Sequence, residues 1–176
     1  MAGPGKPMRH SSFACALTAV LALAALVGAA CFRSIDVATA LTITDVTSGY
    51  FDAGIVQSAE GEKNKLVPSI SFRLKNVDQT PVSGVQVNAV FRRLGEAEEW
   101  GSSYVLGIGP EGLEPGQSTQ PLVVRCPLGY TGLQPRAQML QNHEFVDAKV
   151  QIFAKHGSAN WVKLGEYVIV RQLLTH

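Results

Sequence analysis

The histidines are the side chains most able to do chemistry in this 176-residue chain, and their spacing matches no metal-ligand pattern. His143 and His156 are thirteen positions apart, and neither has a cysteine or a second histidine at a spacing that zinc ligands use. The pair His143-Glu144 matches part of a zinc-protease pattern, but Asp147 stands where the second histidine is required. We therefore expect surface or turn histidines, and no metal or other cofactor.

The sequence has no clear motif for nucleophilic catalysis or for acid–base catalysis. Ser102-Ser103 has no Gly-x-Ser-x-Gly elbow around it, and Gly107-Ile108-Gly109 lacks the strand-then-helix setting of a phosphate-binding loop. Three glutamates, at positions 96, 98 and 99, share one polar segment with nothing apolar nearby to raise a carboxyl pKa. They are typical of a solvated loop. The sequence therefore predicts a protein that is not an enzyme, with no catalytic residues.

Aromatic side chains are the remaining candidates for contact with a ligand or a partner. Trp100, Tyr104, Tyr130 and Trp161 could stack on a sugar or anchor a protein interface, and the first three are the candidate contact residues. We expect Trp161 and at least one tyrosine to fill the core, because β-sandwiches commonly bury such residues.

An amino-terminal targeting segment precedes the expected folded domain. Twenty residues from Phe13 to Phe32 have no charge and no proline. As a helix this run would be about 30 Å long, enough to cross a bilayer. Positive residues ahead of it should stay in the cytoplasm, which places the rest of the chain outside. We expect residues 1–40 to be a signal or anchor segment with a transmembrane helix at about 13–32. Residues 41–176 would then form an extracytoplasmic domain, anchored on the periplasmic face of the cytoplasmic membrane.

Three fates of this segment stay open. Ala38-Thr39-Ala40 has small residues where a signal peptidase reads them, so a secreted form can be imagined. Gly28-Ala29-Ala30-Cys31 resembles the lipobox of bacterial lipoproteins, with Gly28 at the position that usually holds leucine, which makes Cys31 a possible lipidation site. An uncleaved anchor agrees best with the length of the apolar run, because secretory apolar regions are usually shorter.

The chain beyond the apolar run is almost neutral. The whole sequence has 15 basic and 14 acidic residues, and Lys6 and Arg9 precede the apolar run. The 13 basic residues that remain against 14 acidic ones give a net charge of −1. Without a concentrated basic face, nucleic acid is not an expected partner. Cys126 is the only cysteine in the expected domain, which excludes an internal disulfide. Its alternation with Leu122 and Val124 predicts a buried, inert thiol.

From Leu41 onward, a two-residue period predicts short strands with one buried face. The predicted strands are residues 41–46, 70–75, 85–91, 100–108, 122–126, 146–152 and 161–173. Phe72 and Val150 should share one core. Ser58 to Lys65 is rich in charge and reads as a loop, and the only helix expected outside the anchor lies near Gln134 to Gln141. About seven strands between Gly, Pro and Asn turns indicate an all-β sandwich or barrel.

Three segments resemble a known kind of module. Phe72 to Asn76, Thr80 to Val87 and Leu113 to Ser118 together are similar to bacterial immunoglobulin-like sandwich domains of the FxLYD type, with Phe91-Arg92 in place of that family's aromatic-Asp pair. The resemblance covers roughly residues 66–124. It implies an immunoglobulin-like antiparallel β-sandwich that acts as an envelope or surface accessory module without catalytic residues.

These observations favour a non-enzymatic, membrane-tethered extracytoplasmic interaction module, an accessory subunit of a bacterial envelope complex. An uncharged sheet face or an edge strand would bind its protein partner. The alternative is a carbohydrate-binding module that uses Trp100 and neighbouring aromatics. Exposure of Trp100 and Trp161 separates the two hypotheses, because a planar row of exposed rings favours sugar and buried rings do not. The identity of the partner and the oligomeric state stay open.

Overall fold

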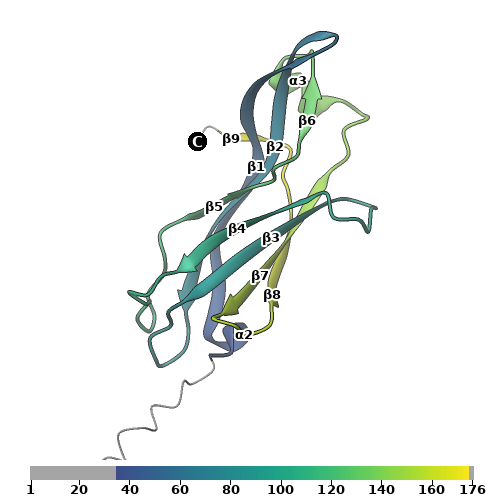
Figure 1. Ribbon diagram of the computed structural model, residues 1–176. Helices are drawn as coiled ribbons and strands as arrows, with labels where there is room; N and C mark the ends of the chain where they lie inside the picture. The colour runs from purple at the N-terminus through teal and green to yellow at the C-terminus, as the bar shows by residue number, and fades with distance from the viewer. Residues whose placement is uncertain (1–34, 175–176) are drawn as a thin grey trace, which may run out of the picture. The chain divides into compact units, whose positions relative to one another are not determined.

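Two β-sheets packed face to face make up the described part of the chain, residues 35–174 of a computed structural model (Figure 1). The compact unit that contains these residues begins at Ser34. The prediction of an all-β sandwich is confirmed. The predicted membrane helix at 13–32 and the candidate lipidation site Cys31 lie outside the described residues.

The first sheet has the strand order β5-β2-β1-β9, and β6 also pairs with β2. Its pairings are antiparallel except for β9, which runs parallel to β1. The strands are β1 (Leu41–Ser58), β2 (Gly61–Asn76), β5 (Leu122–Arg125), β6 (Tyr130–Gly132) and β9 (Leu173–Leu174).

The second sheet has the strand order β4-β3-β7-β8, and all its pairings are antiparallel. Its strands are β3 (Val85–Arg93), β4 (Gly101–Ile108), β7 (Ala148–His156) and β8 (Val162–Val168). Two short helices complete the described elements, α2 (Val37–Ala40) and α3 (Arg136–Gln141). The helix α3 lies where the sequence predicted one, directly after Pro135, which presets the backbone for a helix start.

The core lies between the sheets and is built from alternate residues of their strands. On β3, Val85, Val87, Ala89 and Phe91 are fully buried, while their neighbours on the strand mostly face away. Phe72 of β2 and Val150 of β7 belong to the same buried cluster, as predicted. The predicted faces of these strands are therefore correct.

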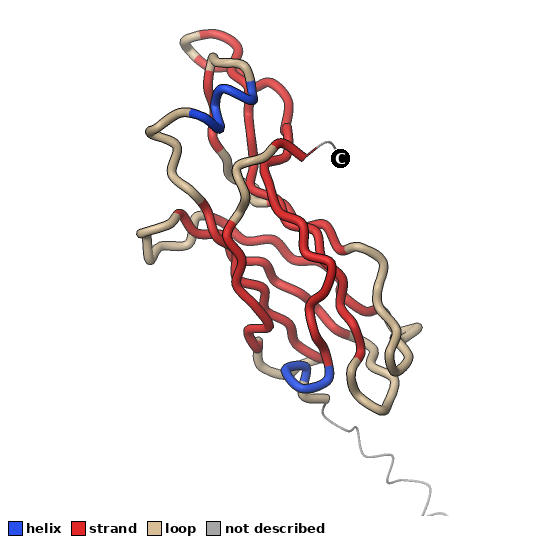
Figure 2. The backbone as a smooth tube through the Cα atoms, turned by 180° about the vertical axis from the view of Figure 1, so that it is seen from behind, coloured by secondary structure: helices blue, strands red, loops and turns tan. Residues whose placement is uncertain are grey.

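The segment from Ser58 to Lys65, predicted as a loop, is almost entirely strand. β1 and β2 form a hairpin in which only Ala59 and Glu60 lie between the paired residues Ser58 and Gly61. Gly61 has a φ of 108°, a conformation that favours glycine. The ribbon runs past the other strands to a tip near α3 (Figures 1 and 2). Its end is largely exposed on both faces, so it lacks the alternation by which a half-buried strand is recognised, and the loop prediction was wrong.

The last predicted strand, Trp161 to Leu173, is broken in the structure. β8 ends at Val168, and the chain then crosses to the other sheet, where β9 pairs with β1. Ser48 of β1 holds the crossing segment, because its hydroxyl donates to the carbonyl of Val168 (3.1 Å) and accepts from the N–H of Val170 (3.2 Å). A segment that crosses from one sheet to the other has apolar residues on more than one side. That pattern made it look like one continuous strand.

The helix α2 packs into the sandwich although it lies within the segment expected to be signal or anchor. The carboxylate of Asp36 accepts a hydrogen bond from the N–H of Ala38 (3.0 Å) and so caps the helix. Val37 and Ala40 are buried in the core, and the carbonyl of Ala40 accepts from the N–H of Val77 (2.9 Å). The predicted domain start at Leu41 therefore falls inside a packed segment.

Candidate functional site

Trp100 and Tyr130, two of the three predicted contact residues, pack against each other at one end of the sandwich. Their ring centroids are 4.9 Å apart, and Phe145 lies 4.3 Å from Tyr130. The guanidinium of Arg93 lies 5.4 Å from the Trp100 ring. Tyr50 closes the group from β1 with its ring 4.9 Å from Phe145. We call Tyr50, Trp100, Tyr130 and Phe145 the aromatic cluster.

The aromatic cluster serves the core more than the surface. Tyr50 is fully buried, and burial is the main cause of its raised pKa. The hydroxyl of Tyr130 is held by donation to the carbonyl of Val146 (2.6 Å), and the pKa of Tyr130 is raised by burial in the same way. Trp100 is only partly exposed and packs on the core. These rings therefore stabilise the end of the sandwich and do not form an open platform.

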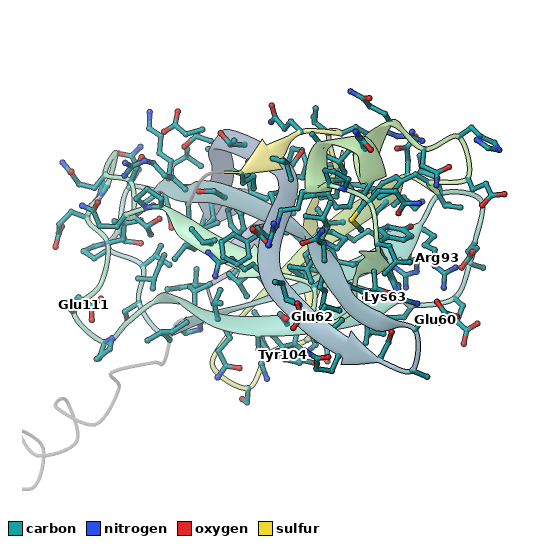
Figure 3. The ribbon with its side chains drawn as sticks, turned by 90° about the horizontal axis from the view of Figure 1, so that it is seen from above. Glu60, Glu62, Lys63, Arg93, Tyr104 and Glu111 are labelled. Atoms are coloured by element: carbon teal, nitrogen blue, oxygen red, sulfur yellow. The ribbon has the colours of Figure 1, made fainter. Side chains whose placement is uncertain are left out.

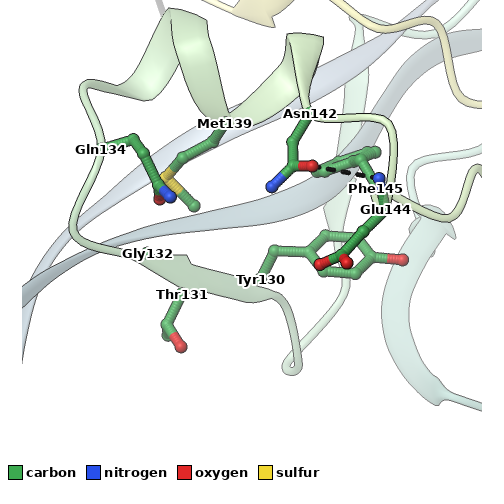
Figure 4. A pocket seen from close by; sticks show the side chains of 8 residues that line it. All are labelled: Tyr130, Thr131, Gly132, Gln134, Met139, Asn142, Glu144 and Phe145. Atoms are coloured by element: carbon green, nitrogen blue, oxygen red, sulfur yellow. Dashed lines mark hydrogen bonds between the residues drawn. The ribbon is translucent and has the colours of Figure 1, made fainter.

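A hollow of about 180 Å³ lies beside Tyr130 (Figure 4). Its wall includes Asn142, whose side-chain oxygen accepts a hydrogen bond from the N–H of Glu144 (3.0 Å). Small-molecule sites usually have volumes of about 300–1,000 Å³, so this hollow is small for such a ligand. It is lined by Tyr130, Thr131, Gly132, Gln134, Met139, Asn142, Glu144 and Phe145.

A second hollow, of about 370 Å³, lies where β4 ends. Its lining is made of glycines, hydroxyl and amide side chains and apolar side chains, with Glu111 as the one ionisable group among them. Glu111 can be found in Figure 3. A lone carboxylate has no second group to which it could pass a proton, so this lining offers no acid–base pair.

The third predicted contact residue, Tyr104, lies on the opposite side of β4 from the core. We call the surface of the second sheet that faces away from the core the outer face. On β3 and β4 it consists of Gln86, Asn88, Val90, Arg92, Ser102, Tyr104 and Leu106. On β7 and β8 it consists of Lys149, Gln151, Phe153, Lys155, Lys163, Glu166 and Val168, and Trp161 precedes β8 beside them.

Large apolar side chains stand exposed on the outer face. The exposed fractions are 66% for Tyr104, 62% for Leu106 and 37% for Trp161, and Tyr104 is labelled in Figure 3. The rings of Tyr104 and Trp161 are 5.9 Å apart and tilted by 55°. The expectation that Trp161 fills the core is wrong. Trp161 precedes β8 in the β7–β8 turn, and its ring packs beside the Lys155 ammonium group, 5.0 Å away.

Strand pairing sets the arrangement of this surface. Asn88 of β3 stands between Tyr104 of β4 and Phe153 of β7, and Gln86 stands between Leu106 and Lys155 in the next row. Directly opposed residues of antiparallel strands hold their side chains about 5 Å apart, so Asn88 lies next to two aromatic rings and Gln86 lies next to a leucine and a lysine. A shallow hollow of about 290 Å³ lies beside Tyr104.

The outer face carries charge, although the sequence led us to expect an uncharged binding surface. Glu166 accepts hydrogen bonds from Lys163 (2.7 Å), Gln151 (2.7 Å) and Lys149 (3.1 Å). These three donors lower the pKa of Glu166 to about 2, so the carboxylate is charged at neutral pH. Lys155 lies beside Trp161, and none of the ion pairs among residues 35–174 includes it.

The remaining sequence candidates are dispersed. His143 is 92% exposed, and its Nε2 lies 4.0 Å from the carboxylate of Glu144 beside it. His156 ends β7, and Glu96 pairs with Arg93 (3.4 Å) in the loop before Trp100. The Ser103 hydroxyl donates to the carbonyl of Arg125 (2.7 Å), which joins β4 to β5. Within residues 35–174 no three His, Cys, Asp or Glu side chains are grouped so that they could hold a metal ion.

Sequence reasoning named Tyr104 and Trp161 as possible contacts, although it favoured the core for Trp161, and it missed the other apolar members of the outer face. One signal was present: Lys149, Gln151, Phe153 and Lys155 occupy the polar phase of β7, and Phe153 is the apolar exception among them. An apolar residue in a polar phase points to the solvent side of a sheet. Leu106 gave no such signal, because it does not belong to a cleanly alternating segment.

Comparison with known proteins adds no family. No protein-family model matches the chain, and no curated protein matches it. The structural-genomics target SoR45 is 13% identical, with a TM-score of 0.39 over 77% of this chain and 86% of that one. A Bordetella pertussis chain that carries the provisional name ApaA is 16% identical, with a TM-score of 0.37 over 74% and 93%. These scores are too low to support an argument about fold or function.

Proposed function

We propose that this chain is a non-enzymatic, membrane-tethered extracytoplasmic interaction module that docks a protein partner on its outer face. It would serve as an accessory subunit of a bacterial envelope complex. The observation that carries the proposal is the exposure of Tyr104, Leu106 and Trp161 on one sheet face. Exposed apolar side chains that gather in one patch mark interaction sites more often than scattered ones do, and Tyr and Trp are enriched where binding energy concentrates.

The sheet order supports a finer proposal, that the sandwich is immunoglobulin-like. The order β4-β3-β7-β8 corresponds to strands C′-C-F-G of such a fold, and β1-β2-β5 corresponds to A-B-E. The FxLYD-like segments fall on β2, on the connection to β3 and on the turns before β5. Immunoglobulin-like modules commonly act by binding, which agrees with the proposed role, although a fold alone does not assign one.

The proposed address rests on the amino-terminal apolar run from Phe13 to Phe32 and on the positive residues before it. The structure adds one finding for the part of the chain that it describes: neither helix there has the length and apolar character to cross a bilayer.

Site-specific crosslinking in intact membranes tests the proposal. A photoreactive amino acid would replace Tyr104 in the full-length chain, and a matched variant would carry it at Val123 of β5, which is 47% exposed on the other sheet. We expect one defined protein adduct from position 104 and none from position 123. Adducts of equal yield from both positions, or no protein adduct from any exposed position, would contradict a docking role for the outer face.

One observation favours a carbohydrate-binding module as the second candidate. Tyr104 and Trp161 are exposed beside the amides of Gln86 and Asn88, and rings next to amides are groups that can contact a sugar. Against it, the two rings are tilted by 55° and do not form one plane, and Trp100 is packed in the aromatic cluster. Retardation in gels that contain envelope polysaccharide, lost in Tyr104→Ala and Trp161→Ala, would favour this candidate over a protein partner.

A further inference from the structure

The outer face carries more cations than acids, whereas the rest of the described domain carries more acids than cations. Lys6, Arg9 and Arg33 precede residue 35, so residues 35–174 contain 12 of the 15 basic residues and all 14 acidic ones. Four of these cations, Arg92, Lys149, Lys155 and Lys163, belong to the outer face, and Glu166 is its single acid. The remaining surface holds 8 basic and 13 acidic residues. A domain with a net charge of −2 therefore presents one face with a surplus of three positive charges.

These four cations differ in whether they already pair with a carboxylate. Lys149 and Lys163 both pair with Glu166. Arg92 hydrogen-bonds to the carbonyl of Ala97 and to the side chain of Gln151, next to a loop that carries three glutamates. Lys155 is in none of the ion pairs among the described residues. Lys163 shares one carboxylate with Lys149, so the positive surplus lies mainly on Lys155, beside Trp161, at the far end of the sheet from the glutamate loop.

The same region holds the exposed apolar groups. Lys155 lies in the row of Gln86 and Leu106, and its ammonium group is 5.0 Å from the Trp161 ring, which itself contacts Tyr104. A partner that covers Tyr104 and Leu106 must bring its own groups next to Lys155. A basic partner would leave that ammonium group facing another cation, a repulsion that selects against the wrong partner.

We propose that the partner of the outer face is an acidic protein segment. Its apolar side chain packs against Tyr104, Leu106 and Trp161, and its flanking carboxylates pair with Lys155 and Lys163. This inference rests on the proposed function and adds the chemistry of the partner. Carboxylates opposite lysines on a partly exposed rim steer the encounter and fix the register, while the aromatic centre supplies most of the affinity.

Two synthetic peptides are the probes. Each has a central Phe-Leu pair; one is flanked by aspartates and glutamates and the other by lysines. Binding to the full-length chain in detergent micelles is followed by fluorescence anisotropy. We expect the acidic peptide to bind more tightly than the basic one, and its affinity to fall as sodium chloride is raised from 50 to 500 mM, because salt screens exposed pairs over about 10 Å or less.

Charge reversal locates the binding. Lys155→Glu should weaken the acidic peptide by about tenfold, the size expected when an exposed pair becomes a repulsion. Lys75→Glu, an exposed lysine of β2 on the other sheet, is the matched control and should leave the affinity unchanged. Tyr104→Ala should weaken both peptides, because it removes apolar contact and no charge. Unchanged melting temperatures of the variants would show that folding is not the cause.

Several outcomes would overturn the inference. They are equal affinity for the two peptides, equal effects of Lys155→Glu and Lys75→Glu, or Lys155-dependent binding of heparin or of phosphatidylglycerol vesicles without binding of the acidic peptide. The two proposals can fail separately. If the crosslinked adduct at position 104 forms as strongly in Lys155→Glu, the acidic partner is wrong and the docking role stands. If no protein adduct forms at any position, the docking role itself is wrong.

Discussion

At the scale of single residues, the buried side chains of the sandwich do two kinds of work. Phe72 and its neighbours in the hydrophobic core remove apolar surface from water, which is the largest favourable contribution to folding. Tyr50 also buries a titratable hydroxyl, and this makes the free energy of unfolding depend on pH. Each kind of side chain gives a separate prediction.

Replacing Phe72 with alanine should lower the free energy of unfolding by about 3–5 kcal/mol, because its ring on β2 is fully buried and its removal leaves a cavity. Urea denaturation measures the change. Val123→Ala is the matched control, since Val123 is 47% exposed on the adjacent strand, and should change stability by less than about 1 kcal/mol. Similar losses for the two variants would mean that the inward and outward faces of this sheet are misassigned.

The Tyr50 hydroxyl should make the protein less stable in alkali. Burial is the largest cause that raises its pKa above the ordinary value of about 10, followed by the nearby charges of Tyr130 and Asp147. Below pH 10 both the folded and unfolded states keep the proton. Above pH 10 the unfolded state releases it first, so stability falls as pH rises, by up to about 1.4 kcal/mol per pH unit for this group.

Urea denaturation between pH 8 and pH 11 measures this dependence. Tyr50→Phe should show a shallower decline above pH 10 than the unchanged protein. Some decline will remain, because burial also raises the pKa of Tyr130 and of the Cys126 thiol. Parallel declines for the two proteins would show that Tyr50 is not the group responsible.

At the scale of elements, the short helix α2 decides where the folded domain begins. Its residues Val37 and Ala40 are buried, and its cap at Asp36 precedes them. A cleavage after Ala40, one of the three fates that the sequence allows, would remove this helix from the core. The place of cleavage therefore has a consequence for stability that the small-residue pattern does not reveal.

Two truncations test the contribution of α2. Deleting residues 1–34 should leave a domain that unfolds cooperatively. Deleting residues 1–40 should lower its free energy of unfolding by at least about 1.5–3 kcal/mol, the value of burying the Val37 side chain alone. Thermal and urea denaturation of the two purified domains measure the difference. Equal stability would show that α2 is not part of the cooperative unit.

At the scale of the whole sandwich, the two sheets share one core, and the segment from Val168 to Leu173 ties one sheet to the other. Arg171 strengthens this tie, because its guanidinium donates to Asp147 (2.6 Å) and to the carbonyl of Phe145 (2.7 Å). Sheets that share a core and a covalent crossing should unfold together.

A single unfolding transition is therefore expected from probes placed on either sheet. Trp161 reports on the second sheet when Trp100 is replaced by phenylalanine, and Cys126, which follows β5 and is 2% exposed, reports on the first. In the domain without residues 1–34, where Cys126 is the only cysteine, tryptophan fluorescence and the rate of thiol labelling should change at the same urea concentration, with labelling slow in the folded protein. Separate midpoints, or rapid labelling without urea, would contradict a single cooperative sandwich with a buried thiol.

The sequence alone determined the fold class, most strand positions and the inward faces. A strand with one buried face has apolar residues at every second position, as in Val85 to Phe91. This pattern can be recognised within one short segment of the sequence. The sequence also predicted α3 after Pro135, and the alternation of Leu122, Val124 and Cys126 predicted that this thiol is buried. Tertiary structure decided the elements whose burial is not periodic: the solvated β1–β2 ribbon, the crossing after Val168 and the packed helix α2.

For the candidate site too, the sequence predicted one part and the tertiary structure decided the rest. The residue types of Trp100, Tyr104 and Tyr130 identified them as possible contacts, but their types could not separate a packed ring from an exposed one. Pairing of β4 with β3 turned Tyr104 outward, and the turn before β8 brought Trp161 to it from 57 positions away in the sequence. The positive surplus of the outer face also required the fold, because Arg92, Lys149, Lys155 and Lys163 come from three strands that only the sheet places side by side.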